Sequence, residues 1–233
     1  MARCLCDEAD ARRLLNPGPV TIVTSEWRGE TNAAPIIWTT SLSMEPPLVG
    51  LVIHPQRYSA DMLRFSEEFV INIPGPSLMR QTAFLGSKSG RDGNKLEEAG
   101  LDLFRGQRTE PPLIEGCLAW IECGVTDVQP FGDHILFVGN VLKVQAMDEA
   151  YAGMWKLEER NSSPLTYLGG THYAIVGDPL EAQYEVDLQG RLIAETPEQR
   201  EEREEREAQE RERRQQEGDE GYEEMIRRNA DQQ

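Results

Sequence analysis

Residues 31–53 read TNAAPIIWTTSLSMEPPLVGLVI, two strand-like runs separated by prolines. The runs, Thr31–Thr40 and Leu48–His54, are rich in β-branched residues and have the length of ordinary strands. Between them stand Glu45, Pro46 and Pro47, and consecutive prolines favour a turn over a continued strand. The stretch therefore predicts two successive strands of an antiparallel sheet.

The sequence on either side extends this pattern. Val20–Ser25 and Glu68–Ile73 are further short β-branched runs, the first followed by a turn at 27–29. Between the strands that end at 54 and begin at 68, Ser59–Phe65 is typical of a short amphipathic helix with Met62, Leu63 and Phe65 on one side. We expect this helix to cap one end of a barrel.

The second half of the chain adds a hairpin and a polar loop. Two long strand-like runs, Cys117–Val128 and Ile135–Gln145, are joined through residues 129–134, and Tyr173–Val176 is a last short strand. Helices are expected at 7–15 and Ser77–Leu85, the second leading into a loop rich in glycine and serine at 86–95. The expected fold is mainly β and antiparallel, with flanking helices.

Length and composition predict one domain with an appendage. A chain of 233 residues, 39% of them hydrophobic, can bury one good core. Residues 1–190 are the expected domain and 191–233 the expected tail. From 197 to 216 the tail is almost wholly Glu, Arg and Gln, with oppositely charged pairs at helical i,i+4 spacing but no apolar face. We expect a charged helix or a disordered segment.

Charge and hydropathy exclude several classes of partner. The net charge of −17 repels phosphate backbones, so nucleic acid is not expected. The longest apolar runs, such as 47–53, have the length of strands and are too short to span a bilayer. Because the N-terminus also lacks the pattern of a signal peptide, we expect a cytoplasmic protein that does not bind membranes.

The four cysteines do not favour a metal site. Neither Cys4-x-Cys6 nor the Cys117/Cys123 pair has the spacing of zinc knuckles. Cys117 and Cys123 are expected on one face of a strand, roughly 20 Å apart at about 3.3 Å per residue, so they cannot form a disulfide with each other. Buried neutral thiols are the favoured interpretation and a redox role is the alternative.

Several segments together resemble the flavin reductase-like family, and within it the flavoredoxin-type branch. The likeness covers roughly residues 16–177, and its order and spacing are more specific than any one segment. It is carried by NPGPVTIVTS at 16–25, TNAAPIIWTTSLSMEPPLVGLVI at 31–53, RYSADMLRFSEEFVINIP at 57–74, GSKSGRDGNKLEEAGL at 86–101, GDHILFVGNV at 132–141 and PLTYLGGTHYAIVG at 164–177. The resemblance implies an FMN-binding split β-barrel.

The resemblance also implies which residues hold FMN. The run Ile37, Trp38, Thr39, Thr40 and Ser41 is similar to the strand that lines the isoalloxazine and ribityl chain in the family; ordinary barrel core for Trp38 and a polar strand end for the three hydroxyls are the alternatives. Ser87, Ser89, Gly90 and Lys95 resemble the loop that reaches the phosphate or ribityl chain, often across a dimer interface. The alternative is an ordinary mobile loop.

An acidic protein can hold the FMN phosphate only by collecting positive charge locally. Arg57, Tyr58 and Ser59 provide a cation and the start of a helix, so Ser59 and the following amides are expected to receive the phosphate while Arg57 forks onto two of its oxygens. Asp61 is unfavourable for such a site and should point away. The alternative is that Ser59 is only an N-cap and Arg57 only a surface charge.

His134 lies in Gly132-Asp133-His134, which matches the place where the family has a histidine near the nicotinamide or the substrate face of the flavin. A structural histidine is the alternative. His54 and His172 receive no role. No G-x-G-x-x-G fingerprint follows a strand, so NADH or NADPH is expected to dock transiently over the flavin.

The expected function is an NAD(P)H:FMN oxidoreductase that supplies reduced flavin to a partner monooxygenase or to another acceptor. The alternatives are a flavoenzyme with tightly bound FMN acting on a specific organic substrate, and a non-catalytic flavin-binding electron carrier. A homodimer is expected because the family commonly completes each flavin site with a neighbouring subunit, and because Pro111–Ile114 would be left uncovered in a lone barrel.

Overall fold

A computed structural model of the chain describes residues 8, 11–15, 18–157, 160–177 and 179, with the isolated tail positions 189, 205, 206, 208, 209 and 213. The chain divides into two units, residues 1–179 and 180–233, and the fold below is that of the first. The tail positions 205, 206, 208, 209 and 213 are α-helical. The remainder of the expected helix at 197–216 lies outside the described residues, as do Cys4 and Cys6.

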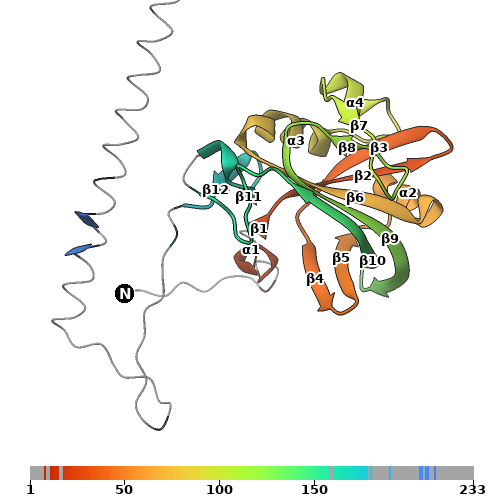
Figure 1. The fold of residues 1–233 in the computed structure, drawn as a ribbon. Coiled ribbons are helices and arrows are strands. Elements are labelled where there is room, and N and C mark those ends of the chain that lie inside the picture. The colour runs from red at the N-terminus through yellow and green to blue at the C-terminus, as the bar shows by residue number, and fades with distance from the viewer. Residues whose placement is uncertain are drawn as a thin grey trace, which may run out of the picture. The chain divides into compact units, whose positions relative to one another are not determined.

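The main element is a seven-stranded sheet in which every neighbouring pair is antiparallel (Figure 1). Its strand order is β3-β2-β6-β9-β10-β5-β4. The strands are β2 (Thr21–Trp27), β3 (Glu30–Ile36), β4 (Thr39–Met44), β5 (Pro47–Ile53), β6 (Glu68–Pro74), β9 (Cys117–Phe131) and β10 (His134–Ala146). The expected antiparallel β fold is confirmed.

The single strand expected at 31–40 is two strands, β3 and β4, on opposite edges of the sheet. The chain crosses between the edges through Ile37 and Trp38, and the Trp38 carbonyl accepts a hydrogen bond from the Val52 amide at 2.9 Å. The hydroxyl of Thr21 on β2 donates to the Ile36 carbonyl and contacts the Thr39 hydroxyl, both at 3.1 Å. Because consecutive strands take opposite edges, the sheet curls into a barrel that is split between β3 and β4.

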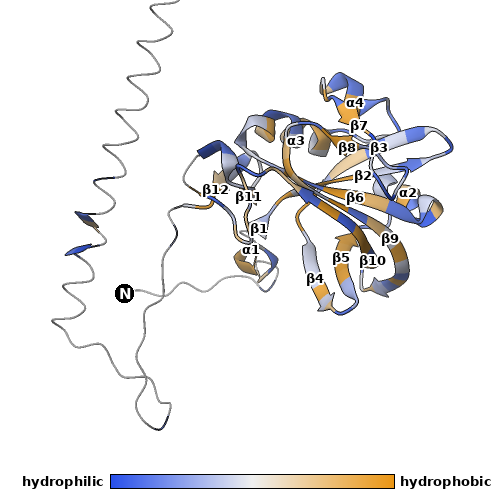
Figure 2. Cartoon of the chain, viewed as in Figure 1, coloured by the Kyte–Doolittle hydropathy of each residue, from blue (hydrophilic) through white to orange (hydrophobic). Residues whose placement is uncertain are grey.

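One core lies inside the curled sheet and is closed by a helix. Phe69, Leu51 and Phe137 are fully buried there. The helix is α2 (Tyr58–Ser66), which buries Leu63 in the same cluster, as expected. Phe65 differs from the prediction, since it is 58% exposed and stacks on Trp27 with 4.8 Å between ring centroids. Figure 2 shows that apolar residues concentrate along the central strands.

A second core lies on the other face of the sheet. It joins Ile22, Val70 and Trp120 to residues of the covering elements. These elements are a 3₁₀ turn η2 (Pro76–Leu78), α3 (Met79–Ser87), α4 (Lys95–Glu98), and the two-stranded pair β7 (Leu103–Phe104) and β8 (Leu113–Ile114). Pro111–Ile114 is buried here, so the argument for a dimer from an uncovered segment was wrong.

A smaller three-stranded sheet follows the barrel. It has the order β1-β11-β12 and consists of β1 (Gly18–Pro19), β11 (Leu165–Gly169) and β12 (His172–Ile175). The Val20 amide donates to the Leu165 carbonyl at 3.0 Å, which fixes this sheet to the start of β2. The short helix α1 (Ala11–Leu15) and the 3₁₀ turn η3 (Arg160–Ser162) complete the described elements of the first unit. No helix among the described residues is both long and apolar enough to cross a membrane.

The two cysteines of β9 lie in different cores, so the expectation that they share a face was wrong. Cys117 belongs to the outer cluster and Cys123 to the inner one. Ile73 pairs with Ala119 but Pro74 pairs with Cys117, so Leu118 is an extra residue that reverses the alternation. Burial raises the pKa of each thiol to about 12, which keeps both neutral, as expected.

A buried carboxylate, Glu122 on β9, organises the loop at 106–110. It is fully buried and accepts the backbone N–H groups of Gln107, Arg108 and Thr109 at 2.7 to 3.1 Å. Gly106 permits the approach, since a Cβ there would lie 2.4 Å from Glu122 Oε2. Burial acts to raise the pKa of Glu122, but the backbone hydrogen bonds outweigh it and the pKa is lowered.

Glu122→Ala should lower the free energy of unfolding by about 3 kcal/mol at pH 7, because three N–H donors lose a charged acceptor. Since the folded-state pKa is below the ordinary value of 4.5, the stabilisation is present above about pH 4.5 and is lost as the pH falls through the folded pKa. Urea unfolding at pH 7 and at pH 4 measures both effects. Glu115→Ala is the control, because Glu115 is exposed. If both variants lost the same small amount of unfolding free energy, this role of Glu122 would be contradicted.

Candidate functional site

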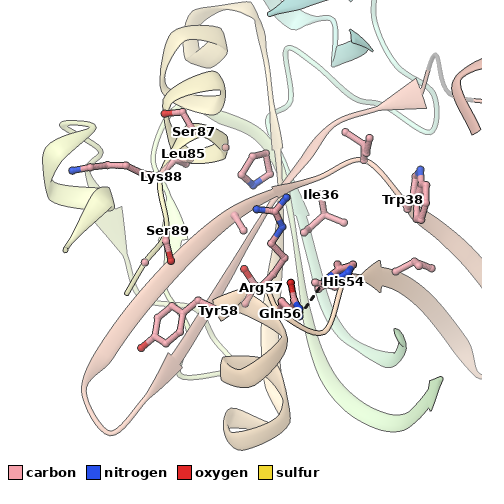
Figure 3. Close-up of a pocket in the computed structure, with 18 of the residues that line it drawn as sticks. Ile36, Trp38, His54, Gln56, Arg57, Tyr58, Leu85, Ser87, Lys88 and Ser89 are labelled. Carbon is pink, nitrogen blue, oxygen red and sulfur yellow. Dashed lines mark hydrogen bonds between the residues drawn. The ribbon is translucent and has the colours of Figure 1, made fainter. Parts of the chain in front are cut away.

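A cleft of about 1080 Å³ opens on one side of the barrel. Its walls come from the β3–β4 junction, the end of β5, the start of α2, the segment from Leu85 to Lys95, the β9–β10 turn, and Arg12 of α1 (Figure 3). Pockets for drug-sized ligands commonly measure about 300 to 1,000 Å³. This cleft therefore has room for a large ligand.

The lining concentrates positive charge in a chain whose net charge is −17. The lining cations are Arg12, Arg57, Lys88, Arg91 and Lys95, against the carboxylates Asp92 and Asp133. Lys88 pairs with Glu98 and Arg91 with Asp61, so the excess of positive charge comes from Arg12, Arg57 and Lys95. A cleft with an excess of one charge attracts ligands of the opposite charge. The lining therefore favours an anionic ligand.

Arg57 is held at one end of the cleft by a tight turn. Its amide donates to the His54 carbonyl at 3.0 Å, and it is the N-cap residue of α2 with an extended backbone. Figure 3 shows its side chain extending from the start of α2 into the cleft. The helix begins one residue earlier than expected, and among the described residues no side chain caps it. Ser59 is therefore not an N-cap; it is buried inside the first turn.

Lys95 lies buried beside the same end. Only 5% of the residue is exposed, and its Nζ donates to the carbonyls of Leu85 at 3.0 Å and Lys88 at 3.2 Å. Desolvation, together with the charge of Arg57, lowers the pKa of Lys95 to about 8. Both cations line the same cleft. An anion between them would relieve their repulsion.

The polar loop is folded onto the barrel by its own contacts. Ser87 donates from its hydroxyl to the Phe84 carbonyl at 2.8 Å, and Ser89 Oγ accepts the Arg91 amide at 3.2 Å. Gly90 packs so closely that a Cβ would lie 2.3 Å from Asn32 Oδ1 and 2.7 Å from the Tyr58 ring. Asn32 in turn donates from Nδ2 to Ser59 Oγ at 3.4 Å. These contacts pack the loop against β3 and α2.

Three rings line the part of the cleft next to the turn that holds Arg57 (Figure 3). The ring of His134 lies 4.7 Å from that of Trp38 and 5.3 Å, edge to face, from that of His54. The Gln56 amide donates to His54 Nδ1 at 3.2 Å, so the ring proton of neutral His54 is on Nε2. His134 Nδ1 is 2.7 Å from Asp133 Oδ1, and this hydrogen bond lowers the pKa of Asp133. The His134 ring is tilted by 44° to Trp38 and by 89° to His54, so the three rings form an aromatic lining with polar edges and not a single flat surface.

The structure brings together most of the residues expected at the site. Ile37, Trp38, Arg57, Tyr58, Ser59, Ser87, Ser89, Gly90, Lys95 and His134 all line the cleft. Thr39, Thr40 and Ser41 do not, because the chain has already turned into β4 on the sheet edge; Thr40 and Ser41 are exposed there. These three residues lie outside this cleft, and their expected contact with the flavin stays a prediction.

The family model of the flavin reductase like domain matches residues 12–175. The chain belongs to the flavin reductase-like family. A relative named NADH:FMN oxidoreductase, from Rhodococcus qingshengii, is 29% identical over 68% of this chain and 76% of its own length. Solved structures of the family share the split-barrel fold described above.

Two solved structures bear on the chemistry of the site. The FMN-binding protein of Thermus thermophilus, solved with bound 1-cyclohex-2-enone, superposes with a TM-score of 0.68 at 27% identity, covering 78% of this chain and 99% of that one. Nitrilotriacetate monooxygenase component B from Mycobacterium thermoresistibile superposes with a TM-score of 0.63 at 29% identity, covering 78% and 94%. This chain is similar to both in fold.

Among the lining residues that the sequence alone did not indicate are His54, Arg91 and Arg12. His54 had been given no role, yet the turn after β5 places its ring against His134. Arg91 crosses to α2, and Arg12 comes from α1. The position of His54 at the end of the predicted strand 48–54 was the one available signal, because side chains at strand ends gather at barrel rims.

Proposed function

We propose that the chain is a flavin reductase that binds FMN in this cleft and passes hydride to it from NADH or NADPH. One observation carries the proposal: a single cleft joins two cations, Arg57 and Lys95, to an aromatic lining. FMN has the matching chemistry, a phosphate at one end and a flat ring system at the other. The Rhodococcus relative is consistent with this activity.

Each part of the cleft has a separate task. Arg57 would fork onto the phosphate and Lys95 would add its third N–H, while the amides at the start of α2 add donors and a favourable dipole. Gly90 lets the loop pack directly against Asn32 and Tyr58, since a Cβ there would collide with both. These contacts fix the ligand without needing to react with it.

Bound FMN would supply the ring that accepts hydride from the nicotinamide. Trp38 and His54 would support the nicotinamide ring as it stacks over the flavin ring. His134, oriented by Asp133, would donate or accept a hydrogen bond through Nε2. Hydride transfer needs close approach and orientation rather than a protein acid or base. The histidines therefore serve to position the second substrate.

A turnover assay with free FMN tests the activity. Oxidation of NADH or NADPH should accelerate as free FMN is raised above the protein concentration, because reduced flavin leaves and oxidised flavin replaces it. We infer from the likeness to monooxygenase component B that a partner monooxygenase consumes the reduced flavin. Failure to oxidise either nicotinamide with any flavin would favour the non-catalytic electron carrier instead.

A second candidate is a flavoenzyme that keeps its FMN and acts on a small organic molecule. The ring wall of Trp38, His54 and His134 favours it, because the polar ring edges suit a planar carbonyl compound, and the Thermus relative was solved with cyclohexenone. In that case the rate of nicotinamide oxidation would depend on the organic substrate and not on added FMN.

We propose that the chain is a homodimer. β4 is an edge strand, and its Leu42 and Met44 are 44% and 95% exposed, so a second copy would bury apolar surface along it. Light scattering at micromolar concentration, with FMN present, should give twice the chain mass of 26.3 kDa. A monomer under these conditions would contradict the proposal.

A further inference from the structure

Arg91 fastens the polar loop to the start of α2. Its Nη1 donates to the Gln56 carbonyl at 3.2 Å, its Nη2 pairs with Asp61 Oδ2, and its guanidinium lies 5.2 Å from the centre of the Tyr58 ring. The three contacts reach the residues before, at and after the first helical position of α2. They tie two parts of the cleft wall that are 30 or more residues apart in sequence.

The ion pair between Arg91 and Asp61 affects how well an anion can bind at the start of α2. It is the acidic residue in the first turn of α2, the same turn that contains Ser59 and follows Arg57. A carboxylate there opposes an anion at the helix start, since like charges repel and the carboxylate already uses the favourable dipole. The pair with Arg91 cancels that charge.

The loop that carries Arg91 is closed at both ends. Lys95 bonds the carbonyls of Leu85 and Lys88, which holds the base of the loop, and Gly90 is seated against Asn32 and Tyr58. Asn32 Oδ1 has no hydrogen-bond partner among the described residues. Its contact with Gly90 is therefore one of packing and not a hydrogen bond. Arg91 adds an ion pair that links this loop to α2.

We propose that Arg91 is a positioning residue for recognition of the flavin phosphate: it neutralises Asp61 and so permits an anion to bind beside Arg57 and Lys95. The proposal rests on FMN being the ligand of the cleft. Arg91 acts through Asp61 and not as a phosphate ligand. Selectivity for a phosphorylated flavin therefore depends on an ion pair at the edge of the site.

A double-mutant cycle separates these roles. Arg91→Ala should weaken FMN binding roughly tenfold, the effect of one uncompensated charge near the phosphate, and leave riboflavin within about twofold. Asp61→Asn alone should raise FMN affinity, by no more than roughly tenfold, because it leaves the positive charge of Arg91 uncompensated near the phosphate. Asp61→Asn combined with Arg91→Ala should recover most of the lost FMN affinity.

Fluorescence titration of both flavins into the full chain gives these affinities. Arg105→Ala is the matched control, because Arg105 is also an exposed arginine that pairs with carboxylates and a backbone carbonyl but lies outside the cleft. Thermal melts verify folding, and Arg91→Gln replaces Arg91→Ala if the alanine variant does not fold.

The outcomes are distinct. Loss of FMN affinity that Asp61→Asn does not restore would make Arg91 a direct phosphate ligand and overturn the proposal. Equal weakening of FMN and riboflavin would also overturn it, by showing general support of the loop. If the wild-type chain bound no flavin, the proposed function itself would fail, whereas a preference for FMN that survives Arg91→Ala would contradict only the role of Arg91.

Discussion

Arg57→Ala should lower FMN affinity roughly tenfold to a hundredfold while riboflavin binds about as before. Removing a charge-assisted hydrogen bond to a phosphate commonly costs on the order of 1.5 to 3 kcal/mol, and riboflavin lacks the phosphate. Arg57 extends into the cleft from the start of α2, where Lys95 is its cationic neighbour. Fluorescence quenching with both flavins measures the effect.

Arg64→Ala is the matched control for Arg57. Arg64 is exposed in the last turn of the same helix and does not line the cleft. It should leave both affinities unchanged. Equal weakening of FMN and riboflavin by Arg57→Ala would contradict the assignment of Arg57 to the phosphate. Riboflavin has no phosphate, so loss of a phosphate contact cannot weaken its binding.

Lys95→Met should abolish most of the preference for FMN and also its dependence on pH. In the wild-type chain the pKa of Lys95 is about 8, and a bound phosphate favours the charged amine. The ratio of FMN to riboflavin affinity should therefore be highest near pH 7 and fall as the pH rises above 8, by up to about tenfold per unit. The methionine variant should give a low, flat profile.

The stability of the flavin-free chain provides a second readout for Lys95. Its folded pKa is lowered from 10.5 to about 8, so between these values the folded state binds fewer protons than the unfolded state. Stability should rise with pH across this window, and the cost of burying the charge is fully present below pH 8. Urea unfolding at pH 7.5 and pH 9.5 measures how the free energy of unfolding changes with pH. An identical change in Lys95→Met would show that another group causes this pH dependence.

The strands could be predicted from sequence because their signal is local. The runs at 20–25, 48–54 and 68–73 correspond to β2, β5 and β6 within one or two residues. The break between β3 and β4 was missed, since Ile37 and Trp38 are as suited to a strand as their neighbours and only the curl of the sheet separates them. The bulge at Leu118 was missed for a related reason, because pairing with Pro74 and not composition creates it.

Part of the site was predicted, and most of the predicted residues came from the resemblance to the family. The resemblance indicated Trp38, Arg57 and Lys95, which the fold brings to one cleft. Other contacts of the site depend on tertiary structure: Arg91 pairs with Asp61, 30 residues earlier, and His54 contacts His134 because β5 and β10 are neighbouring strands. Pairs at such separations leave no periodic signal in a single sequence.

Anaerobic addition of a nicotinamide to the FMN-loaded protein tests the central claim most directly. NADH or NADPH should bleach the visible absorption of the bound flavin, and readmitted air should restore it. A substitution at His134 should slow the bleaching by a larger factor than it weakens FMN binding, since this residue belongs to the ring lining proposed to orient the nicotinamide and not to the cations proposed to hold the phosphate. Flavin that stays bound and oxidised with both nicotinamides in excess would contradict the account.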